Sequence, residues 1–148
     1  MSSKNLVPYE KTLLVKDCCL CLHVQRAART LARRFDEVLR PFELTNGQFS
    51  LLMSLNRPEP PGMGPVAGLL GMDRTTLTAA LKPLERGGLV KVIPDPADGR
   101  SRILKLTVKG RNLLARALPV WRSTHEEVER MMAGEAPEVL RRGLRALA

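Results

Sequence analysis

Hydrophobic residues recur at helical spacing over most of this sequence, which predicts a mainly helical protein. The stretch 71–86 shows the pattern most clearly, with apolar residues on one side of a helix and polar residues on the other. Its buried stripe is formed by Leu77, Leu81 and Leu84. Asp73 stands where its carboxylate can accept the free amide hydrogens of the first turn, and Gly87-Gly88 follows the last turn. We expect a short capped helix with one exposed polar face.

A long helix precedes this region. It is expected to run from Lys11 to Leu39, with one apolar stripe, and Pro41 ends it because the residue before a proline is pushed out of the helical region. A helix of this length would extend about 43 Å, which is more than a compact domain of 148 residues needs for its own core. We therefore expect it to pack against a second copy of the chain.

Shorter elements follow the long helix. Thr45 and Gln48 have the spacing of a capping box at the start of a second helix. The prolines of RPEPPGMGP then exclude regular structure, and 64–70 has room for two helical turns before Asp73. Two short helices joined by a turn that contains glycine are a candidate helix-turn-helix.

The pattern changes from helical to alternating beyond Gly87-Gly88. LVKVI and RILKLTV alternate, and IPDPADGRS between them carries the Pro, Asp and Gly of a turn, so we expect a β-hairpin with a basic tip. Helical spacing returns over 109–132, with a bend expected at Pro119, and a short last helix begins at Pro137.

The basic residues are concentrated in one part of the chain. There are 24 Lys and Arg against 15 Asp and Glu, a net charge of +9, which favours a polyanionic partner such as nucleic acid or an anionic membrane surface. Residues 74–111 carry nine basic and three acidic groups, so +6 of the +9 lies in the segment that begins with the polar-faced helix. A generally adhesive basic protein would spread this charge or hold it in a tail. The distribution favours nucleic acid.

Neither a membrane span nor a secretion signal is expected. No apolar run approaches the roughly 18 residues that a span needs, and the N-terminus lacks the hydrophobic region of a signal peptide. We expect a cytoplasmic protein without a membrane partner. The cysteines Cys18, Cys19 and Cys21 form neither a disulfide framework nor a spaced zinc set, so we expect reduced thiols, no metal and no cofactor.

The order and content of these segments resemble the MarR family of bacterial transcriptional regulators. The resemblance is carried by LTNGQFSLLMSL, by MDRTTLTAALKPLERGGLV and by DPADGRSRILKLTVKGR. Asp98-Gly99-Arg100 is similar to the Asp-x-Arg wing signature of the family, and Leu106-Thr107 and Lys109-Gly110 follow at the expected distance.

The resemblance covers nearly the whole chain and implies its organisation. The expected fold is mainly α with a small β-hairpin wing, in a single domain over 1–148. A winged helix-turn-helix lobe occupies 45–108, and N- and C-terminal dimerisation helices occupy 11–40 and 109–148.

The resemblance also implies a homodimer that binds a near-palindromic operator in double-stranded DNA, as a repressor. The recognition helix would enter the major groove and the wing the adjacent minor groove. The candidate groove contacts of the helix are Arg74, Thr75, Thr76, Thr78 and Lys82, because their side chains donate to bases and phosphates. Pro83 should bend the last turn of this helix and is not assigned to binding.

The wing candidates are Asp98, Arg100 and Arg102. Arg100 is expected at the wing tip, where the negative potential of a narrow minor groove attracts an inserted guanidinium. By the same resemblance, Asp98 forms the ion pair that holds the wing loop in shape. Turn chemistry alone would explain Gly99 but not the arginine that follows it.

Members of the family usually respond to a small molecule, often an aromatic acid or another phenolic compound, bound between the dimerisation helices and the lobe. The resemblance therefore implies an effector that releases the DNA. His23 and Arg26 on the first helix are the candidate polar groups for an anionic effector. A solvated or dimer-interface pair is the alternative interpretation.

The cysteines suggest a second route to regulation. In the branch of the family that senses organic hydroperoxides, a reactive cysteine lies early in the first helix, at a position similar to Cys21, with Cys18 as a neighbour here. That branch activates its thiolate with tyrosines, and the matching positions hold Phe35 and Asn46. A thiol without nearby donors reacts slowly with peroxide, which favours small buried residues in a helix. A bond between Cys18 and Cys21 would distort that helix.

Two alternatives come from other classes of function. The winged helix could be a protein-interaction module whose basic face binds an acidic partner, although a wing arginine and a face rich in hydroxyls favour DNA. A thiol enzyme using a cysteine with His23 or His125 lacks an orienting acid and a nucleophile motif, so we expect no enzymatic activity.

Overall fold

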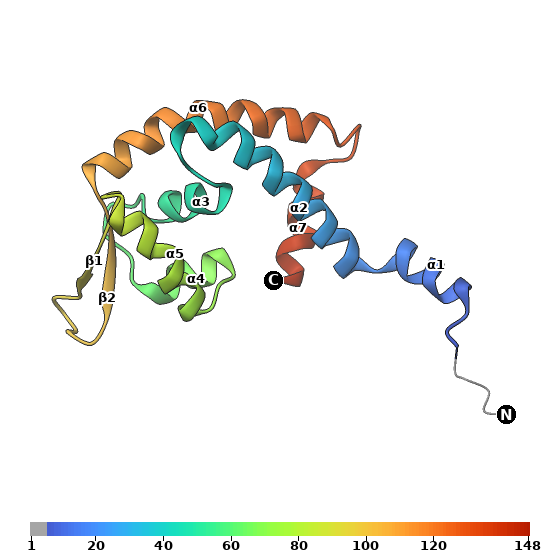
Figure 1. Cartoon of the computed structure of the whole chain (residues 1–148), viewed down its shortest axis with the longest axis horizontal. Helices are drawn as coiled ribbons and strands as arrows, with labels where there is room; N and C mark the ends of the chain where they lie inside the picture. Colours follow the sequence, from blue (N-terminus) through green and yellow to red (C-terminus); the bar gives the residue numbers. More distant parts are fainter. Residues whose placement is uncertain (1–5) are drawn as a thin grey trace. The chain divides into compact units, whose positions relative to one another are not determined.

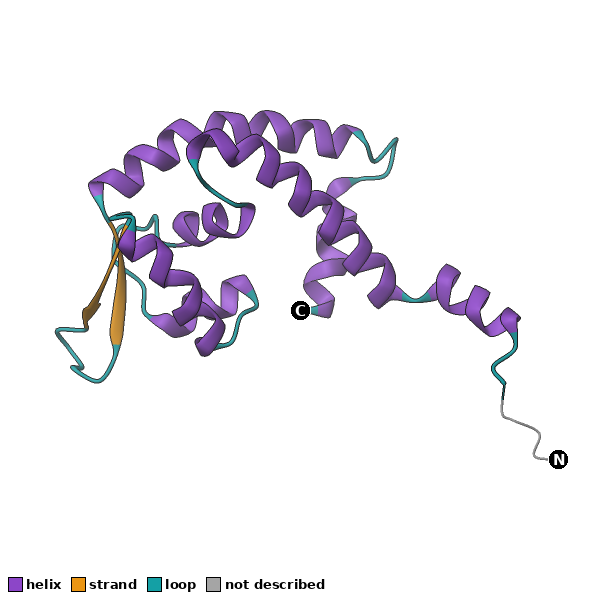
Figure 2. Cartoon of the chain, viewed as in Figure 1, coloured by secondary structure: helices purple, strands orange, loops and turns teal. Residues whose placement is uncertain are grey.

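The structure is a computed structural model that describes residues 6–148 (Figure 1). Helices make up most of it, and one two-stranded antiparallel sheet accompanies them over the described residues (Figure 2). The elements are α1 (Tyr9–Cys18), α2 (Leu20–Leu39), the 3-10 helix η1 (Arg40–Phe42), α3 (Asn46–Ser54), α4 (Met63–Leu70), α5 (Arg74–Arg86), β1 (Val90–Pro94), β2 (Arg102–Leu106), α6 (Val108–Arg130) and α7 (Pro137–Leu147). The predicted mainly helical fold with a small hairpin is confirmed.

The chain forms two compact units, a first that ends at Arg34 and a second from Phe35 to Ala148. In the first unit, the prediction of one helix over 11–39 is wrong, because Cys19 separates α1 from α2 with a ψ of 108°, outside the helical region. α2 begins there because the backbone N–H of Leu22 donates to the Cys19 sulfur over 3.4 Å and the N–H of His23 donates to the Cys19 carbonyl over 3.1 Å. A helix of 20 residues extends only about 30 Å. The argument from helix length for a second copy therefore fails.

The core of the second unit lies among α3, α4, α5, the hairpin and α6. The predicted buried stripe of α5 is confirmed, since Leu77, Leu81 and Leu84 are buried. α3 buries Phe49, Leu51 and Leu52, because it packs against both α4 and α6. An amphipathic pattern with a single buried side misses a helix that is enclosed on two sides.

Side-chain caps fix where α3, α5 and α6 begin. The predicted capping box of α3 is present: the N–H of Gln48 donates to Thr45 Oγ1 over 3.2 Å, and the N–H of Thr45 donates to Gln48 Oε1 over 3.0 Å. Asp36, near the end of α2, accepts the backbone N–H of Asn46 over 2.7 Å and its side-chain amide over 2.8 Å. These hydrogen bonds, the backbone one foremost, hold the pKa of Asp36 below its usual value. The end of α2 is thereby attached to the start of α3.

The hairpin has the predicted strands and a register that places one face on the core. Val90 pairs with Leu106 and Val92 with Leu104, and three of these four side chains are buried. The proline-rich segment before α4 forms no regular element but adds one contact, since the N–H of Leu104 donates to the Pro61 carbonyl over 2.8 Å. The inner edge of the wing is thus fixed to the start of α4.

A junction of hydrogen bonds connects the end of α5, the base of the wing and the start of α6. The Thr107 hydroxyl donates to the Gly88 carbonyl over 2.7 Å and accepts the N–H of Gly110 over 3.0 Å. The N–H of Thr107 donates to the Leu89 carbonyl over 3.0 Å, and Lys109 Nζ donates to the Gly87 carbonyl over 2.7 Å. We refer to these contacts as the wing junction.

α6 runs without interruption through Pro119, and an ion pair from Arg141 joins α7 to its far end. Arg141 Nη1 lies 2.7 Å from Glu129 Oε1, and the same guanidinium contacts Glu138 over 2.9 Å. The hydrogen bond from Arg141 lowers the pKa of Glu129, and those from Arg145 and then Arg141 lower the pKa of Glu138. Over residues 6–148, no helix combines the length and apolar character that a membrane crossing requires.

Candidate nucleic-acid interface

The polar face of α5 is exposed along its whole length. The Asp73 carboxylate accepts the N–H of Thr76 over 2.7 Å, as predicted, and this bond lowers the pKa of Asp73. All five predicted contact residues of this helix are exposed: Arg74, Thr75, Thr76, Thr78 and Lys82. Thr78 differs from the others because its hydroxyl donates to the Arg74 carbonyl over 2.8 Å. Thr78 therefore presents its methyl group and the remaining acceptor lone pair of its hydroxyl outward.

The wing loop is shaped by Asp98, although not in the way that was predicted. Asp98 Oδ1 accepts the backbone N–H of Arg100 over 3.1 Å, and Oδ2 accepts the hydroxyl of Ser101 over 3.0 Å. No ion pair joins Asp98 to the Arg100 guanidinium among residues 6–148, so the predicted ion pair is wrong. The short carboxylate reaches the backbone of its own turn more readily than a guanidinium that extends into solvent. The side chain of Arg100 is therefore left available.

The structure brings the recognition helix and the wing together at one cavity. This cavity of about 430 Å³ lies between the start of α4, the start of α5 and the wing, and three guanidinium groups line it, those of Arg74, Arg100 and Arg102. One carboxylate, that of Asp95, shares the lining. Arg102 also donates to the Gly99 carbonyl over 3.5 Å. Residues predicted separately for the helix and the wing thus form one basic surface, which suits the closely spaced phosphates of DNA.

Two further basic residues on the wing escaped the sequence analysis. Lys91 and Lys105 are directly paired across β1 and β2, and both are exposed. Like charges in such a pair destabilise a sheet unless an anion lies near them. The alternation of LVKVI and RILKL places both lysines on the outer face of the hairpin, but only the register of the strands shows that they are paired.

The candidate effector and redox residues all lie in the first unit. His23 and Arg26 are exposed on α2, and His23 Nδ1 lies 2.7 Å from the Cys19 carbonyl oxygen. Cys18 and Cys21 are free and exposed, so the interpretation of these two thiols as small buried residues is wrong for the single chain. The Gln25 amide donates to the Cys21 sulfur over 3.2 Å, a donor at helical spacing that the sequence analysis overlooked. Because Cys19 interrupts the helix, the argument against a bond between Cys18 and Cys21 no longer applies.

Comparison with known proteins agrees with this geometry. The sequence profile of the MarR family matches residues 44–101. The transcriptional regulator HosA of Escherichia coli O111:H- is 34% identical over 99 residues, which cover 66% of this chain and 72% of HosA.

Solved structures extend the similarity to nearly the full chain. The M. tuberculosis transcriptional regulator MosR, in complex with DNA, is 40% identical with a TM-score of 0.78, over 87% of this chain and 92% of MosR. The transcriptional repressor CouR, bound to a 23-mer DNA duplex, is 32% identical with a TM-score of 0.73, over 90% of this chain and 92% of CouR. The chain therefore belongs to the MarR family of DNA-binding transcriptional regulators, with the winged helix-turn-helix lobe that its sequence predicted.

Proposed function

We propose that this protein is a homodimeric repressor that binds a near-palindromic operator and is released by a small anionic effector. The observation that carries the proposal is the basic surface shared by Arg74 of α5 and by Arg100 and Arg102 of the wing. It lies beside the exposed threonines of α5, so donors for bases and for phosphates occupy one side of one lobe. The DNA complexes of MosR and CouR support this use of the lobe.

In this proposal, α5 enters the major groove and the wing enters the adjacent minor groove. A major groove about 12 Å wide admits a single helix, and most of the exposed side chains of α5 are polar. Arg100 stands in the wing loop with its backbone held by Asp98, so its guanidinium can enter a narrow minor groove at little entropic cost to the loop. Arg102 and Lys82 contact phosphates and set the register.

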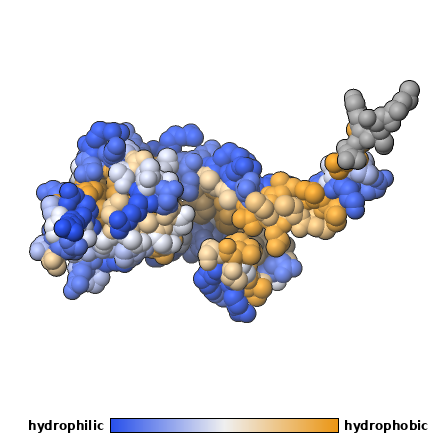
Figure 3. Space-filling model, turned by 90° about the horizontal axis from the view of Figure 1, so that it is seen from below, coloured by the Kyte–Doolittle hydropathy of each residue, from blue (hydrophilic) through white to orange (hydrophobic). Residues whose placement is uncertain are grey.

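The homodimer is supported by apolar surface that the single chain leaves uncovered. On α2, Leu20 is 67% exposed and Val24 is also exposed, and on α7 the exposed fractions reach 60% at Val139 and 65% at Leu147. Figure 3 shows hydrophobic surface on both helices. Each helix thus exposes apolar side chains of its own, and exposed apolar patches mark protein–protein interfaces. A dimer with two lobes would read the two halves of a palindrome.

The effector part of the proposal is supported by two relatives that share the fold. The DNA binding of BpsR from Bordetella bronchiseptica is regulated by 6-hydroxynicotinic acid, and CouR from Rhodococcus jostii has been solved with p-coumaroyl-CoA. Both ligands combine an aromatic ring with an acid or a phosphate group. In this chain, His23 and Arg26 are the proposed polar contacts of such an effector, from the exposed side of α2.

The test is a selection of bound sites from a random DNA pool, followed by titration of the selected duplex at fixed salt. We expect Arg100→Ala to weaken binding by at least about 1 kcal/mol, or roughly fivefold, without changing the oligomeric state. The matched control is Arg122→Ala, an exposed arginine on α6, which should leave the affinity unchanged. Equal affinities of the Arg100 variant and the parent would refute the wing role. An affinity that did not fall as salt rises would refute DNA binding through phosphates.

A second candidate function is a peroxide-responsive regulator that uses Cys21. The donor from Gln25 to the Cys21 sulfur favours it, because hydrogen bonds stabilise the thiolate that attacks a peroxide. A hydroperoxide would oxidise this thiol to the sulfenic acid and become an alcohol. If this route operates, peroxide lowers the operator affinity of the parent but not of Cys21→Ser.

Selection of no DNA sequence at all, with capture of an acidic protein, would instead favour the protein-interaction module.

A further inference from the structure

A basic groove lies beside β2 and contains none of the residues assigned so far to DNA contacts. It encloses about 240 Å³ between the segment after α3, the end of β2 and the first turn of α6. Three cationic side chains line it, those of Arg57, Lys105 and Arg111. Lys91 is the cross-strand partner of Lys105, so the two lysines share the outer face of the hairpin. We refer to these four residues as the outer wing surface.

Both arginines of the outer wing surface are positioned by backbone carbonyls. Arg57 Nε donates to the Ser54 carbonyl at the end of α3 over 3.0 Å, and Arg111 Nη1 donates to the Leu106 carbonyl at the end of β2 over 3.2 Å. A guanidinium has five N–H donors, so each arginine keeps donors for an external acceptor. Because the two groups are already oriented, a ligand loses less affinity to the ordering of their side chains.

No negative charge balances this surface. Within the described part of the chain, the groove lining contains no aspartate or glutamate, and none of its cations forms an ion pair. Glu59 stands between two prolines of the lining, Pro58 and Pro60, but is not part of the lining itself. A residue before proline is extended, and successive side chains of an extended segment point to opposite sides, which accounts for this exclusion. The surface therefore presents four exposed cations together.

An extended polyanion fits this arrangement better than a small anion. A small anion held in the groove would leave Lys91 unmatched, because Lys91 does not line it. The two paired lysines repel each other unless negative charge lies near both of them. Duplex DNA carries one negative charge per about 1.7 Å of its axis, so its backbone can contact the groove and the outer face of the hairpin at the same time.

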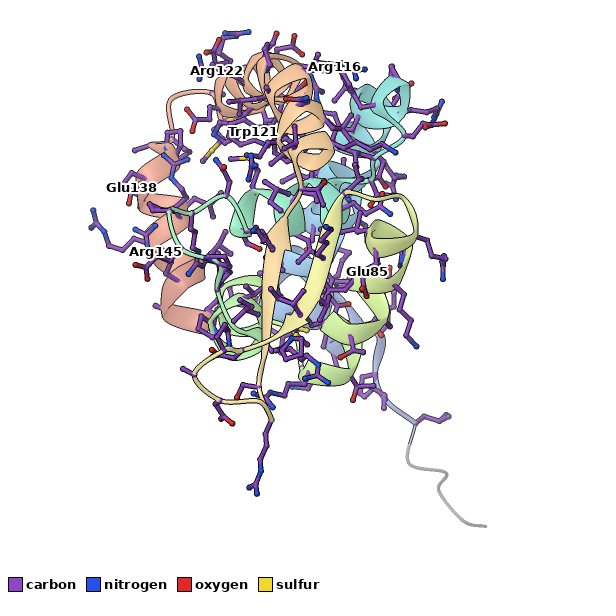
Figure 4. All side chains as sticks on the ribbon, turned by 90° about the vertical axis from the view of Figure 1, so that its left-hand side faces the viewer. Glu85, Arg116, Trp121, Arg122, Glu138 and Arg145 are labelled. Carbon is purple, nitrogen blue, oxygen red and sulfur yellow. The ribbon has the colours of Figure 1, made fainter. Side chains whose placement is uncertain are left out.

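The outer wing surface lies away from the residues proposed to read the half-site. Figure 4 looks at the molecule from the side of the hairpin, and α5 lies to the right of it. Lys105 follows Arg102 by three residues on β2, which places it about 10 Å further along the strand, toward the base of the wing. A straight duplex on α5 and the wing tip leaves this part of the wing uncovered. DNA that bends toward the protein beyond the half-site brings its phosphates to these cations.

We propose that the outer wing surface binds the sugar-phosphate backbone of the DNA that flanks each half-site and stabilises a bend of that DNA toward the protein. This proposal rests on the proposed function, because it requires an operator on α5 and the wing tip. Backbone contacts read no bases directly. The flanking sequence still matters, because pyrimidine–purine steps bend easily whereas A-tracts resist bending. The protein thus selects flanking DNA whose bases it does not contact.

The experiment is a fluorescence anisotropy titration of the full-length protein at fixed salt. It compares the selected operator as a minimal duplex with the same operator extended at each end by about ten base pairs, one helical turn. Flanks with pyrimidine–purine steps should strengthen binding of the parent at least about fivefold, and A-tract flanks should strengthen it less. The double variant Lys91→Gln/Lys105→Gln should bind the two duplexes alike and should match the parent on the minimal one.

The matched control is Arg122→Gln, which removes a positive charge elsewhere on the same lobe. Arg122 is an exposed residue further along α6, above the hairpin in Figure 4, and it does not line the groove. This variant should keep the full gain from the flanks. Thermal unfolding should show the double variant to be at least as stable as the parent, because it removes a pair of like charges.

The proposal is overturned if flanks give the parent no gain, or if the double variant keeps that gain. It is also overturned if the double variant weakens the minimal and the extended duplex equally. Arg100→Ala should weaken both duplexes by the same factor, so failure of the wing-tip contact is distinguishable from failure of the outer wing surface. If no operator is selected at all, the proposed function fails. A long duplex of random sequence then tests the surface, and equal binding by the double variant and Arg122→Gln would overturn it.

Discussion

Gly110 is the position at which a single added methyl group should do most damage to the lobe. A Cβ on this residue would overlap the carbonyl oxygen of Leu89 and lie 2.9 Å from Leu106 Cδ1. The Leu89 carbonyl belongs to the wing junction, where it accepts the N–H of Thr107. The first turn of α6 can therefore pack this closely on the wing only without a side chain. Gly110→Ala is the corresponding perturbation.

The magnitude follows from opposing effects. Overpacking against backbone atoms costs about 1–3 kcal/mol, and a weakened hydrogen bond at Leu89 costs about 1 kcal/mol. Alanine favours a helix over glycine by about 1 kcal/mol. We expect Gly110→Ala to lower the free energy of unfolding by about 2 kcal/mol, which corresponds to a fall in Tm of roughly 4–8 °C for a chain of this size.

The assay is urea unfolding followed by circular dichroism, at one fixed protein concentration because association would change the midpoint. The matched control is Gly68→Ala in α4, where an added Cβ meets no atom within 4 Å. That variant should be stabilised by about 0.5–1 kcal/mol through helix propensity alone. If Gly110→Ala were as stable as the parent, or were stabilised like Gly68→Ala, the close approach of α6 to the wing would be refuted.

Three further predictions concern other parts of the chain. Asp36→Ala should remove about 1 kcal/mol of stability at neutral pH, measured by urea unfolding. Because the pKa of Asp36 is lowered from 3.8 on folding, its contribution is present above that value and is lost as the pH falls through the folded pKa, so parent and variant should converge once the pH is below the folded pKa. Leu144→Glu should shift the sedimentation of the dimer to that of a monomer, since it charges an exposed apolar face of α7. Asp73→Ala should weaken operator binding by loosening the first turn of α5, with the dimer unchanged.

Two of these variants, Asp36→Ala and Leu144→Glu, have a neighbour that serves as a control. Glu37→Ala beside Asp36 should leave the unfolding curve unchanged at both pH values, because Glu37 is exposed. Arg142→Ala on α7 should leave sedimentation unchanged. A persistent difference between parent and Asp36→Ala at low pH would contradict the charge-dependent hydrogen bonds. A monomeric parent would contradict the dimer, and an unaffected Asp73→Ala would contradict the role of the cap.

The features that the sequence predicted are those set by neighbouring residues. A capping hydrogen bond spans three positions, so the starts of α3 and α5 at Thr45 and Asp73 followed directly from residue type and spacing. The stripe of leucines on α5 needed only helical periodicity, and the wing strands only alternation. The candidate contact residues of α5 were predicted in the same way, as polar positions left over from a buried pattern, whereas those of the wing came from its resemblance to the Asp-x-Arg signature.

The features that the sequence missed depend on distant contacts or on a single backbone angle. No proline or glycine marks the break at Cys19. The thiol and the carbonyl of Cys19 instead accept the N–H groups that begin α2. The meeting of Arg74 with Arg100 and Arg102 joins residues that are far apart in the chain. The Asp98 carboxylate could accept from either the backbone N–H or the guanidinium of Arg100. Only the turn geometry selected the backbone N–H. A cavity lined by the segment after α2, the last turn of α5 and the first turns of α6 combines three separate segments and has no local signature.

The wing junction also determines which distances in a dimer can change. Thr107 and Lys109 hold the carbonyls of Gly87, Gly88 and Leu89, so the recognition helix and the wing are rigidly connected at their common base. In the proposed complex, the separation between the major-groove and minor-groove contacts within one half-site would then be constant. What remains adjustable in the proposed dimer is the separation between two such rigid lobes. An effector would thus change the half-site spacing that the protein accepts, while the bases preferred within each half-site would stay the same.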